Sequence, residues 1–408
     1  MSDTDEGVPE SVWVKWSEKI ENDEYRVLKK IVSDDSGNYE IKFLSPLGRG
    51  VSGSVYLTNI NSLKLEESLN GMVYALKIFN NNAASYSHAQ SETTILPLVH
   101  KFVSKSKCGS ITNYYGSFYI SGHPSVILEL GGPTILQTIG WKKFTGFPLT
   151  LIRQVLLKLL TSLSEMEYKG IVHGDIKPEN VLFSLRKYGG FRKFTDYKEC
   201  MAQISHSFMR EEYDSISQMD VFMIDWSSSS IGFQQKAPYM QSRYYRAPEI
   251  LLRTQYGPAV DVWSTGCLAA EMFLGSPLFP GENELEMLRI IQYRLGVFPS
   301  SIIKQMGESS VAKNSTEWII DPKSYIPGTF ETYIREYSGR DDFEMLTFVN
   351  LLRLMLQLNP DARITASAAL FHPFITGEIQ KRIRGRKESL SDNFGRKKSL
   401  RGSLPKDL

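Results

Sequence analysis

The periodicity of the apolar residues changes once along this chain of 408 residues, near residue 131. Before that point, residues 39–44 alternate apolar and polar side chains and residues 72–79 form an apolar run, as β-strands do. After it, apolar residues recur every three to four positions, for example through residues 149–168, as in amphipathic helices. The change predicts two units, a sheet and a helical body, with a hinge at residues 129–132.

Each unit has its own set of expected elements. In the first unit we expect one helix at residues 83–98, ended by Pro97 and its neighbours, and strands at 39–44, 54–57, 72–79, 114–118 and 125–130. In the second we expect short strands at 181–183 and 221–224 and helices at 149–168, 260–274 and 348–358. The predicted fold class is α+β with two lobes, a small antiparallel sheet with one main helix and a larger, mainly helical lobe.

Composition divides the chain into four parts. An N-terminal extension, the small lobe, the large lobe and a C-terminal tail are expected at residues 1–37, 38–130, 131–376 and 377–408. Residues 184–219 separate the two short strands and are too long for a hairpin turn, so they are predicted to be an insertion that is either functional or partly disordered. The tail is polar, with ten Lys or Arg against four Asp or Glu, and is predicted to be disordered. A solvated end, a nuclear-import signal and a nucleic-acid contact remain open for it, in that order.

Charge, cysteine use and hydropathy exclude several classes of protein. The net charge of +2 gives no global field for nucleic acid, so direct nucleic-acid binding is not expected. Cys108, Cys200 and Cys267 form no CxxC pair, which favours buried thiols over a zinc site or disulfides. The acidic N-terminus lacks the apolar core of a secretory signal, and no run approaches the roughly 18 apolar residues of a membrane span. We therefore expect the protein in the nucleus, the cytoplasm or both, with no membrane partner.

Residues 173–180 read HGDIKPEN and carry an acid, a cation and an amide at fixed offsets. Asp175 is suited to orienting a hydroxyl, and Lys177 to neutralising a phosphate. The amide oxygen of Asn180 is suited to binding Mg²⁺. This combination indicates metal-assisted phosphoryl transfer.

A GxGxxG pattern lies earlier, between two expected strands, and consists of Gly48, Gly50 and Gly53. Glycines let backbone N–H groups approach phosphates closely, although glycine turns are also common in plain hairpins. A dinucleotide-binding turn would need a helix immediately afterwards. Because a strand follows, the pattern favours a flap that covers phosphates.

Three further charged residues fit the same chemistry. Lys77 lies in an apolar strand and Glu92 follows on the expected helix, where the two could pair and hold the ammonium against nucleotide phosphates. Asp225 ends a short apolar strand and suits a second metal ligand. Taken alone, a Lys in such a strand is usually an edge residue that points to water, and an Asp before Ser often caps a turn. The order of all these motifs along the chain favours a single catalytic site to which they all contribute.

Over roughly residues 39–375 the chain resembles the eukaryotic protein kinases. The segment YMQSRYYRAPEILL at residues 239–252 is similar to the activation-segment end of the CMGC group. Within that group it most resembles the dual-specificity tyrosine-regulated kinases (DYRK) and their pre-mRNA-processing relatives. The insertion at 184–219 resembles the CDC2-like (LAMMER) kinases instead.

The resemblance implies a bilobal kinase fold, ATP and Mg²⁺ as cofactors, and a role for each matching residue. Asp175 and Lys177 would be catalytic, and Asn180 and Asp225 would hold Mg²⁺. Leu128 would be the gatekeeper beside the adenine. The nucleotide site would comprise Leu47, Gly48, Gly50, Gly53, Val55, Ala75, Lys77, Glu92, Glu129 and Leu130, with the last two offering backbone groups to adenine.

The resemblance also implies regulation and a substrate class. Tyr239 matches a tyrosine that this branch autophosphorylates, and Arg243 and Arg246 would receive its phosphate because Gly174 replaces the usual Arg of the catalytic loop. Glu249 would pair with Arg363 to brace the large lobe. Substrates would be proteins phosphorylated on Ser or Thr, with Pro after the target residue, and the kinase domain would be monomeric.

Two departures from the family pattern bear on activity. Trp226 and Ser227 stand where Phe and Gly are usual, so the contact that sets Asp225 must be repacked and one flexible position is lost. Neither change deletes a group that touches phosphate or metal. An active kinase is therefore the first hypothesis, and a kinase-fold scaffold with little transfer activity is the alternative.

Overall fold

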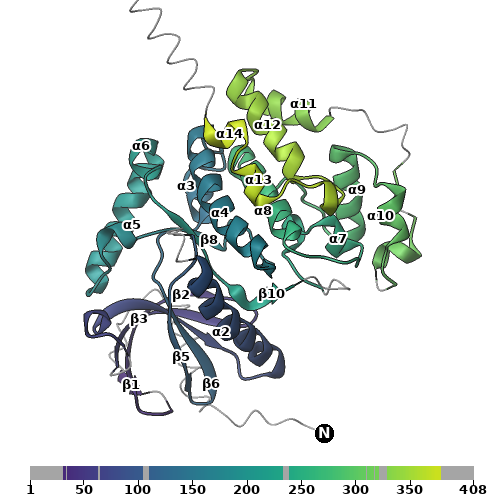
Figure 1. Ribbon diagram of the computed structural model, residues 1–408. Coiled ribbons are helices and arrows are strands. Elements are labelled where there is room, and N and C mark those ends of the chain that lie inside the picture. The colour runs from purple at the N-terminus through teal and green to yellow at the C-terminus, as the bar shows by residue number, and fades with distance from the viewer. Residues whose placement is uncertain are drawn as a thin grey trace, which may run out of the picture.

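The computed structural model describes residues 31–33, 35–62, 65–103, 110–232, 239–308, 310–316, 318–320 and 329–377. These residues form two lobes, with the sheet-containing lobe below the helical lobe in Figure 1. The expected division into a small antiparallel-sheet lobe and a larger helical lobe is confirmed. The basic tail from residue 378 and the first 30 residues lie outside the described part of the chain.

The small lobe is built on an antiparallel sheet with the strand order β1-β2-β3-β4-β6-β5. Its strands are β1 (Ile31–Ser33), β2 (Tyr39–Arg49), β3 (Gly53–Ser62), β4 (Met72–Phe79), β5 (Tyr114–Ile120) and β6 (His123–Leu128). The five expected strands are present, and β1 adds a sixth within residues 1–37. Alternation in β2 buries Tyr39, Ile41 and Phe43 on one face, where Tyr39 stacks on Phe118 at 4.4 Å between ring centroids.

Helix α2 (Ala83–Val103) is longer than expected, because Pro97 lies inside it and does not end it. The expectation that the helix stops at Pro97 is therefore wrong. Proline removes one backbone hydrogen bond within a helix and favours a break. Here burial outweighs that loss, since Ile95, Leu96, Val99 and Val103 all pack into the core on both sides of the proline.

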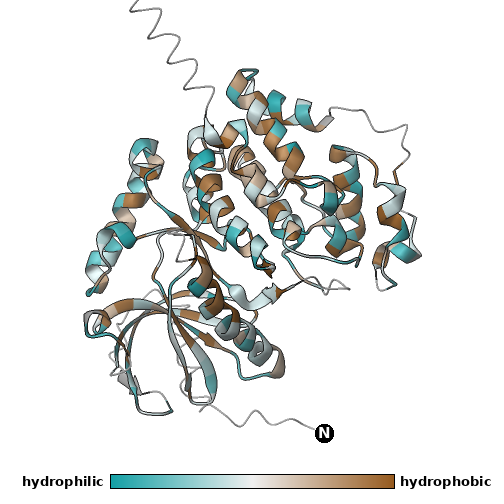
Figure 2. Cartoon of the chain, viewed as in Figure 1, coloured by the Kyte–Doolittle hydropathy of each residue, from teal (hydrophilic) through white to brown (hydrophobic). Residues whose placement is uncertain are grey.

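The large lobe is a bundle of helices around one apolar core. Figure 2 shows hydrophobic brown segments concentrated on its inner helices, and Val260 to Leu274 of α8 are all buried. The main helices are α3 (Ile135–Trp141), α4 (Leu149–Tyr168), α7 (Pro248–Leu251), α8 (Ala259–Leu274), α9 (Glu284–Leu295), α10 (Ser300–Lys304), α11 (Thr329–Ser338), α12 (Phe343–Met355), α13 (Ala366–Ala369) and α14 (Pro373–Thr376).

Two short strand pairs belong to the large lobe. Strand β7 (Ile171–Val172) pairs with β10 (Ser230–Ile231), and β8 (Val181–Phe183) pairs with β9 (Val221–Met223). Strands β7 and β9 pack against α4, and β8 packs against α3. The chain between β8 and β9 is the predicted insertion, and it is ordered into η3 (Arg186–Tyr188), α5 (Phe194–Met209) and α6 (Tyr213–Ile216). Helices α5 and α6 stand at the left side of the large lobe in Figure 1. Phe208 of α5 anchors them against Phe147 and Phe183.

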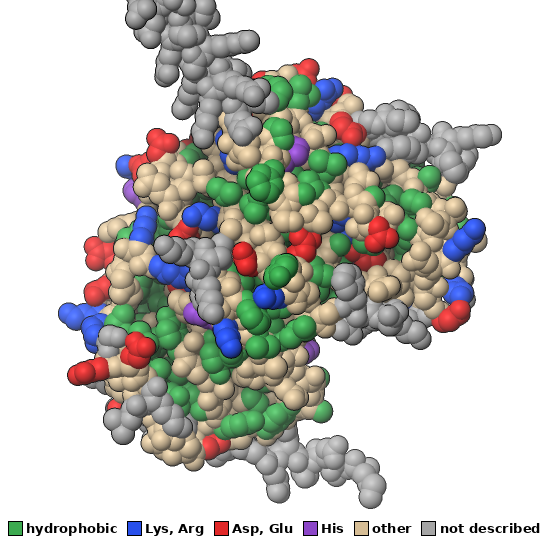
Figure 3. Space-filling model, in the orientation of Figure 1, with side chains coloured by type: hydrophobic (Ala, Val, Ile, Leu, Met, Phe, Trp, Pro, Cys, Tyr) green, Lys and Arg blue, Asp and Glu red, His purple; other side chains and the backbone are tan. Residues whose placement is uncertain are grey.

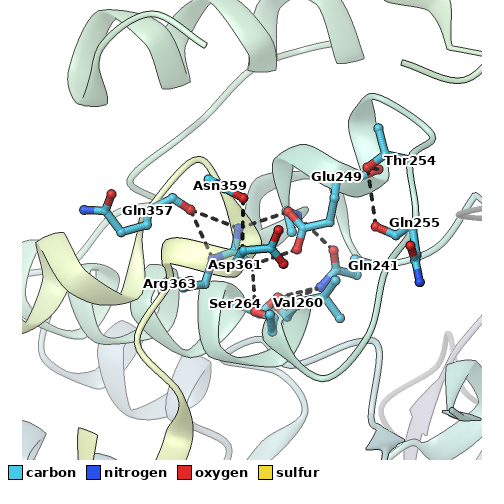
Figure 4. A network of polar contacts seen from close by, with 12 residues as sticks. Gln241, Glu249, Thr254, Gln255, Val260, Ser264, Gln357, Asn359, Asp361 and Arg363 are labelled. Atoms are coloured by element: carbon cyan, nitrogen blue, oxygen red, sulfur yellow. Dashed lines mark hydrogen bonds and ion pairs between the residues drawn. The ribbon is translucent and has the colours of Figure 1, made fainter. Parts of the chain in front are cut away.

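A buried ion pair ties the start of α7 to the end of the large lobe, as expected for Glu249 and Arg363 (Figure 4). The two Arg363 Nη atoms lie 2.7 and 3.0 Å from the two carboxylate oxygens of Glu249. The guanidinium also donates to the carbonyls of Ala259 and Gln357. Both side chains are at most 1% exposed. Buried charges are stable only when they are paired and hydrogen-bonded, and both conditions are met here.

The surface shows no concentration of one charge on the face seen in Figure 3, where acidic and basic side chains are interspersed. Among the described helices, none combines the length and the apolar character that crossing a bilayer would require.

Candidate active site

The β8–β9 pair places two expected metal ligands next to each other. Val181 is paired with Met223, and the backbone N–H of Ile224 donates to the carbonyl of Asn180 at 2.9 Å. Asn180 therefore lies just before the start of β8, and Asp225 lies just after the end of β9, at the same end of the strand pair. Residues 45 positions apart in the sequence meet at one end of a two-stranded ribbon.

Lys77 of β4 lies between two carboxylates. Its Nζ is 2.6 Å from Oε2 of Glu92 on α2 and 2.7 Å from Oδ1 of Asp225. Burial opposes the charge on Lys77, but the two carboxylates outweigh it and raise the pKa of the ammonium. The alternative that Lys77 is a solvent-facing edge residue is excluded, because its side chain is only 8% exposed.

Trp226 joins helix α2 to the metal-ligand side of the site. It belongs to η4 (Trp226–Ser228), which packs directly against α2. Burial raises the pKa of the neighbouring Glu92 carboxyl on α2, despite the positive charge of Lys77. The indole is wholly buried and meets His173 edge-on at 4.6 Å between ring centroids. The larger ring is thus accommodated in the core.

Asp225 adopts a left-handed backbone conformation with φ of +63°. The hydroxyl of Ser227 donates to Oδ1 of Asp225 at 2.8 Å, the same oxygen that binds Lys77. Burial tends to raise the pKa of Asp225, but Lys77 and Ser227 outweigh burial and lower it. Asp225 is therefore held as a carboxylate with a defined orientation.

Asp175 is held by three donors, two from its own loop and one from the activation segment. Its Oδ2 accepts from the amide of Asn180 at 2.9 Å and from Lys177 Nζ at 2.8 Å. Its Oδ1 accepts from the backbone N–H of Ser242 at 2.9 Å. Lys177 also donates to the Ser242 hydroxyl at 2.7 Å, so the catalytic loop and the activation segment share a hydrogen-bond network.

The backbone of the catalytic loop is supported by Asp261 of α8. The two carboxylate oxygens of Asp261 accept from the N–H groups of His173 and Gly174 at 2.7 and 2.9 Å. Gly174 has φ of +81°, and a Cβ there would lie 2.6 Å from both the Ser228 carbonyl oxygen and Met240 Cε. Glycine thus suits the conformation and the space at this position.

The glycine pattern forms the expected flap between β2 and β3. Gly48 pairs with Val55, and the N–H of Gly50 donates to the carbonyl of Gly53 at 2.8 Å. Gly53 has a second role that the sequence did not reveal, because a Cβ there would lie 2.1 Å from the carbonyl oxygen of Ile78 in β4. Leu47 is 41% exposed at the rim of this flap.

The hinge between the lobes begins beside the expected adenine region. Ala75 of β4 pairs with Leu128 of β6, and Leu130 is buried. The N–H of Glu129 is already bonded to the carbonyl of Asn113 at 3.0 Å. Arg186 of the insertion binds the carboxylate of Glu129, a contact without a local sequence signal because 57 residues separate the two.

Tyr239 lies beneath a pair of arginines. The guanidinium carbon of Arg246 is 4.2 Å from the Tyr239 ring centroid, and that of Arg253 is 5.4 Å away. Arg246 lowers the pKa of the exposed Tyr239 phenol by hydrogen bonding and by its charge. Arg243 donates to the carbonyl of Glu282. Arg253, which the sequence analysis did not single out, joins Arg246 at this tyrosine, and both bind Glu284.

The residues present fit Mg²⁺ and a nucleotide. The side-chain amide nitrogen of Asn180 donates two hydrogen bonds to Asp175, one to its backbone carbonyl and one to Oδ2. The amide oxygen of Asn180 is therefore the atom of this side chain that can bind a metal. Asn180 and Asp225 then supply hard oxygen ligands, and Mg²⁺ commonly completes its octahedron with phosphates and water. Within the described residues no group of three His, Cys, Asp or Glu gathers as an alternative metal cage.

The fold and this arrangement of Lys77, Glu92, Asp175 and Asp225 define a protein kinase domain. The protein kinase domain model matches residues 41–375, and the chain belongs to this family.

Curated relatives agree with the resemblance to the tyrosine-regulated kinases. The chain is 29% identical to human dual specificity tyrosine-phosphorylation-regulated kinase 4, over 88% of this chain and 62% of the relative. It is 29% identical to the DYRK-family kinase pom1 of Schizosaccharomyces pombe, over 86% and 29%. It is 28% identical to serine/threonine-protein kinase ppk5 of the same yeast, over 86% and 38%. The chain thus spans less than two thirds of the length of each of these relatives.

Proposed function

We propose that the protein is a Mg-ATP-dependent kinase that phosphorylates Ser and Thr residues of proteins. The observation that carries this proposal is the double ion pair of Lys77 with Glu92 and Asp225, at 2.6 and 2.7 Å. It joins the small-lobe sheet, helix α2 and the metal-ligand segment in one contact. Relatives named as serine/threonine and dual-specificity kinases support the same activity.

The transfer follows from the roles that the geometry supports. Asp175 orients the substrate hydroxyl and accepts its proton as the oxygen attacks the γ-phosphorus. The bond from that phosphorus to the bridging oxygen of ADP breaks, and Lys177 neutralises the charge on the moving phosphoryl group. Lys77 holds the α- and β-phosphates. Bound Mg²⁺, held by Asn180 and Asp225, would supply further charge neutralisation.

Autophosphorylation of Tyr239 belongs to the proposal. The phenol is 68% exposed and lies against Arg246 and Arg253. A phosphate there carries about −1.5 to −2 charges and would compete with Glu284 for these two guanidinium groups. Such an exchange would fix the activation segment without the Arg that Gly174 replaces.

Substrate sequence, oligomeric state and location complete the proposal. We expect a preference for Pro after the target residue and a monomeric kinase domain acting in the nucleus or cytoplasm. Cys200 and Cys267 are buried free thiols, which suits a reducing compartment.

A peptide library tests the proposal directly. Purified chain and Mg-ATP are incubated with Ser-, Thr- and Tyr-centred peptides, and Tyr239 is followed by mass spectrometry. We expect Ser and Thr peptides with Pro after the target to be labelled and Tyr239 to gain phosphate. Binding of Mg-ATP without labelling of any peptide would favour the scaffold alternative and overturn the enzyme proposal.

A further inference from the structure

Residues 186–192, here called the strap, contact both lobes. They follow β8 of the large lobe and the buried Leu185, and they precede α5, which packs against α3 of the same lobe. The strap is therefore rooted in the large lobe at both of its ends. The strap also contacts the small lobe and the hinge, so it links the two lobes.

The first contact is a bidentate ion pair with the hinge. Arg186 Nε and Nη2 lie 2.7 and 2.5 Å from the two carboxylate oxygens of Glu129. Nη2 also donates to the carbonyl of Ile111 at 2.7 Å, and Glu129 accepts the N–H of Asn113 at 3.1 Å. The Glu129 side chain is 7% exposed and that of Arg186 is 30% exposed, so solvent screens the pair only in part.

The second contact is with the edge of the small-lobe sheet. The N–H of Val73 in β4 donates to the carbonyl of Phe191 at 2.7 Å. Strand β6 pairs with β4 only from Ala75 onward. At Val73 the strap therefore binds the side of β4 that β6 covers further along. Arg192 adds a hydrogen bond from Nη1 to the carbonyl of Asn70 at 3.0 Å.

We propose that the strap limits how far the two lobes open and so slows the release of nucleotide, with Arg186 as its positioning residue. This inference rests on the proposed function, since it concerns the same nucleotide site. The hinge carries the backbone groups expected to meet adenine, and the strap holds the hinge from outside that site. Opening the lobes would stretch the ion pair of Arg186 with Glu129 and the sheet-edge bond of Val73 together.

This attachment is suited to control product release. Opening of lids and lobes sets the turnover of many enzymes, and charge-assisted bidentate contacts are the strong ones among such restraints. Loss of one such contact should shift the equilibrium between closed and open lobes about tenfold toward the open state. Arg186 needs no contact with nucleotide to exert this effect.

The test measures the dissociation rate of a fluorescent ADP analogue from the full chain with Mg²⁺ by stopped flow. Arg186→Gln should speed release about tenfold, as expected for the loss of one charge-assisted contact. Arg186→Lys, which keeps the charge but not the paired bonds, should give an intermediate rate. Lys187→Gln removes a neighbouring charge of the same 3-10 helix and should leave release unchanged.

Glu129→Gln breaks the same ion pair from the hinge side and serves if Arg186→Gln does not fold. It should also speed release, whereas wild-type release rates in Arg186→Gln or Glu129→Gln would overturn the strap. The proposed function fails separately, if the wild-type chain transfers no phosphate from Mg-ATP to any peptide. A further readout is steady-state kinetics, in which Arg186→Gln should raise the KM for ATP without the loss of kcat that Asp175→Asn causes.

Discussion

The hydroxyl of Ser227 lies 2.8 Å from Oδ1 of Asp225 and donates a hydrogen bond to it. A serine at this position departs from the family pattern, and the geometry gives it a part in the site. It helps to orient the expected metal ligand on the side where Lys77 binds the same oxygen. The departure at residue 227 therefore adds a constraint on Asp225 and removes none.

Ser227→Ala should weaken the binding of Mg-ATP about fivefold, because a hydrogen bond to a charged group contributes on the order of 1 kcal/mol or more. Asp225 would then sample orientations that do not face the metal. Titration calorimetry with Mg²⁺ and a non-hydrolysable ATP analogue measures this change. Ser228→Ala is the matched control, and equal affinities for the two variants would contradict the role of Ser227.

Gly174→Ala should destabilise the protein more than Gly232→Ala. The two glycines have nearly equal φ values, +81° and +80°, so the backbone strain of about 1 kcal/mol is the same. At Gly174 the new Cβ would also lie 2.6 Å from a backbone oxygen, whereas at Gly232 no other described residue places an atom within 4 Å of it. Urea unfolding should show an extra loss of about 1–3 kcal/mol for Gly174→Ala. Equal losses would show that space does not require glycine there.

Arg363→Ala should lower the free energy of unfolding by about 3–5 kcal/mol, because it leaves the buried Glu249 carboxylate without its partner. The control is Arg340→Ala, which breaks pairs of an arginine that is 41% exposed and should cost about 0–1 kcal/mol. Chemical unfolding followed by fluorescence measures both. Similar losses in the two variants would mean that the buried pair does not brace the large lobe.

The stability of the protein should fall as the pH drops from about 6.5 to about 4. Burial lowers the pKa of His173 from 6.5 to about 4, so the unfolded chain binds a proton in this window and the folded chain does not. The contribution is at most about 3 kcal/mol, present in full above pH 6.5 and lost progressively below it. His173→Phe keeps a ring against Trp226 and lacks the titrating group, so its unfolding free energy should depend less on pH across this window.

The parts of the site that lie close together in the sequence could be predicted. Asp175, Lys177 and Asn180 occupy one short loop, and their spacing alone indicates their chemistry. The two lobes could also be predicted, because apolar periodicity records which faces are buried. The predicted end of α2 at Pro97 was wrong, because burial of apolar residues on both sides of the proline outweighed its tendency to break a helix.

Other contacts between distant segments could not be predicted, although the family resemblance implied the pair of Glu249 with Arg363. Asp261 supports the catalytic loop from α8, 87 residues beyond Gly174. Arg186 reaches the hinge through an insertion whose helices were not expected, and Arg253 reaches Tyr239 only after α7 has turned the chain. No periodicity or local motif in the sequence marks these partners.

Phosphate transfer by the wild-type chain and by Asp175→Asn tests the central claim most directly. Each purified protein is incubated with radiolabelled Mg-ATP and a basic protein substrate, and incorporated phosphate is counted. The catalytic role of Asp175 predicts clear transfer by the wild type and a loss of at least about 100-fold in the variant, with ATP binding retained. Equal transfer by the two proteins, or none by the wild type, would contradict it.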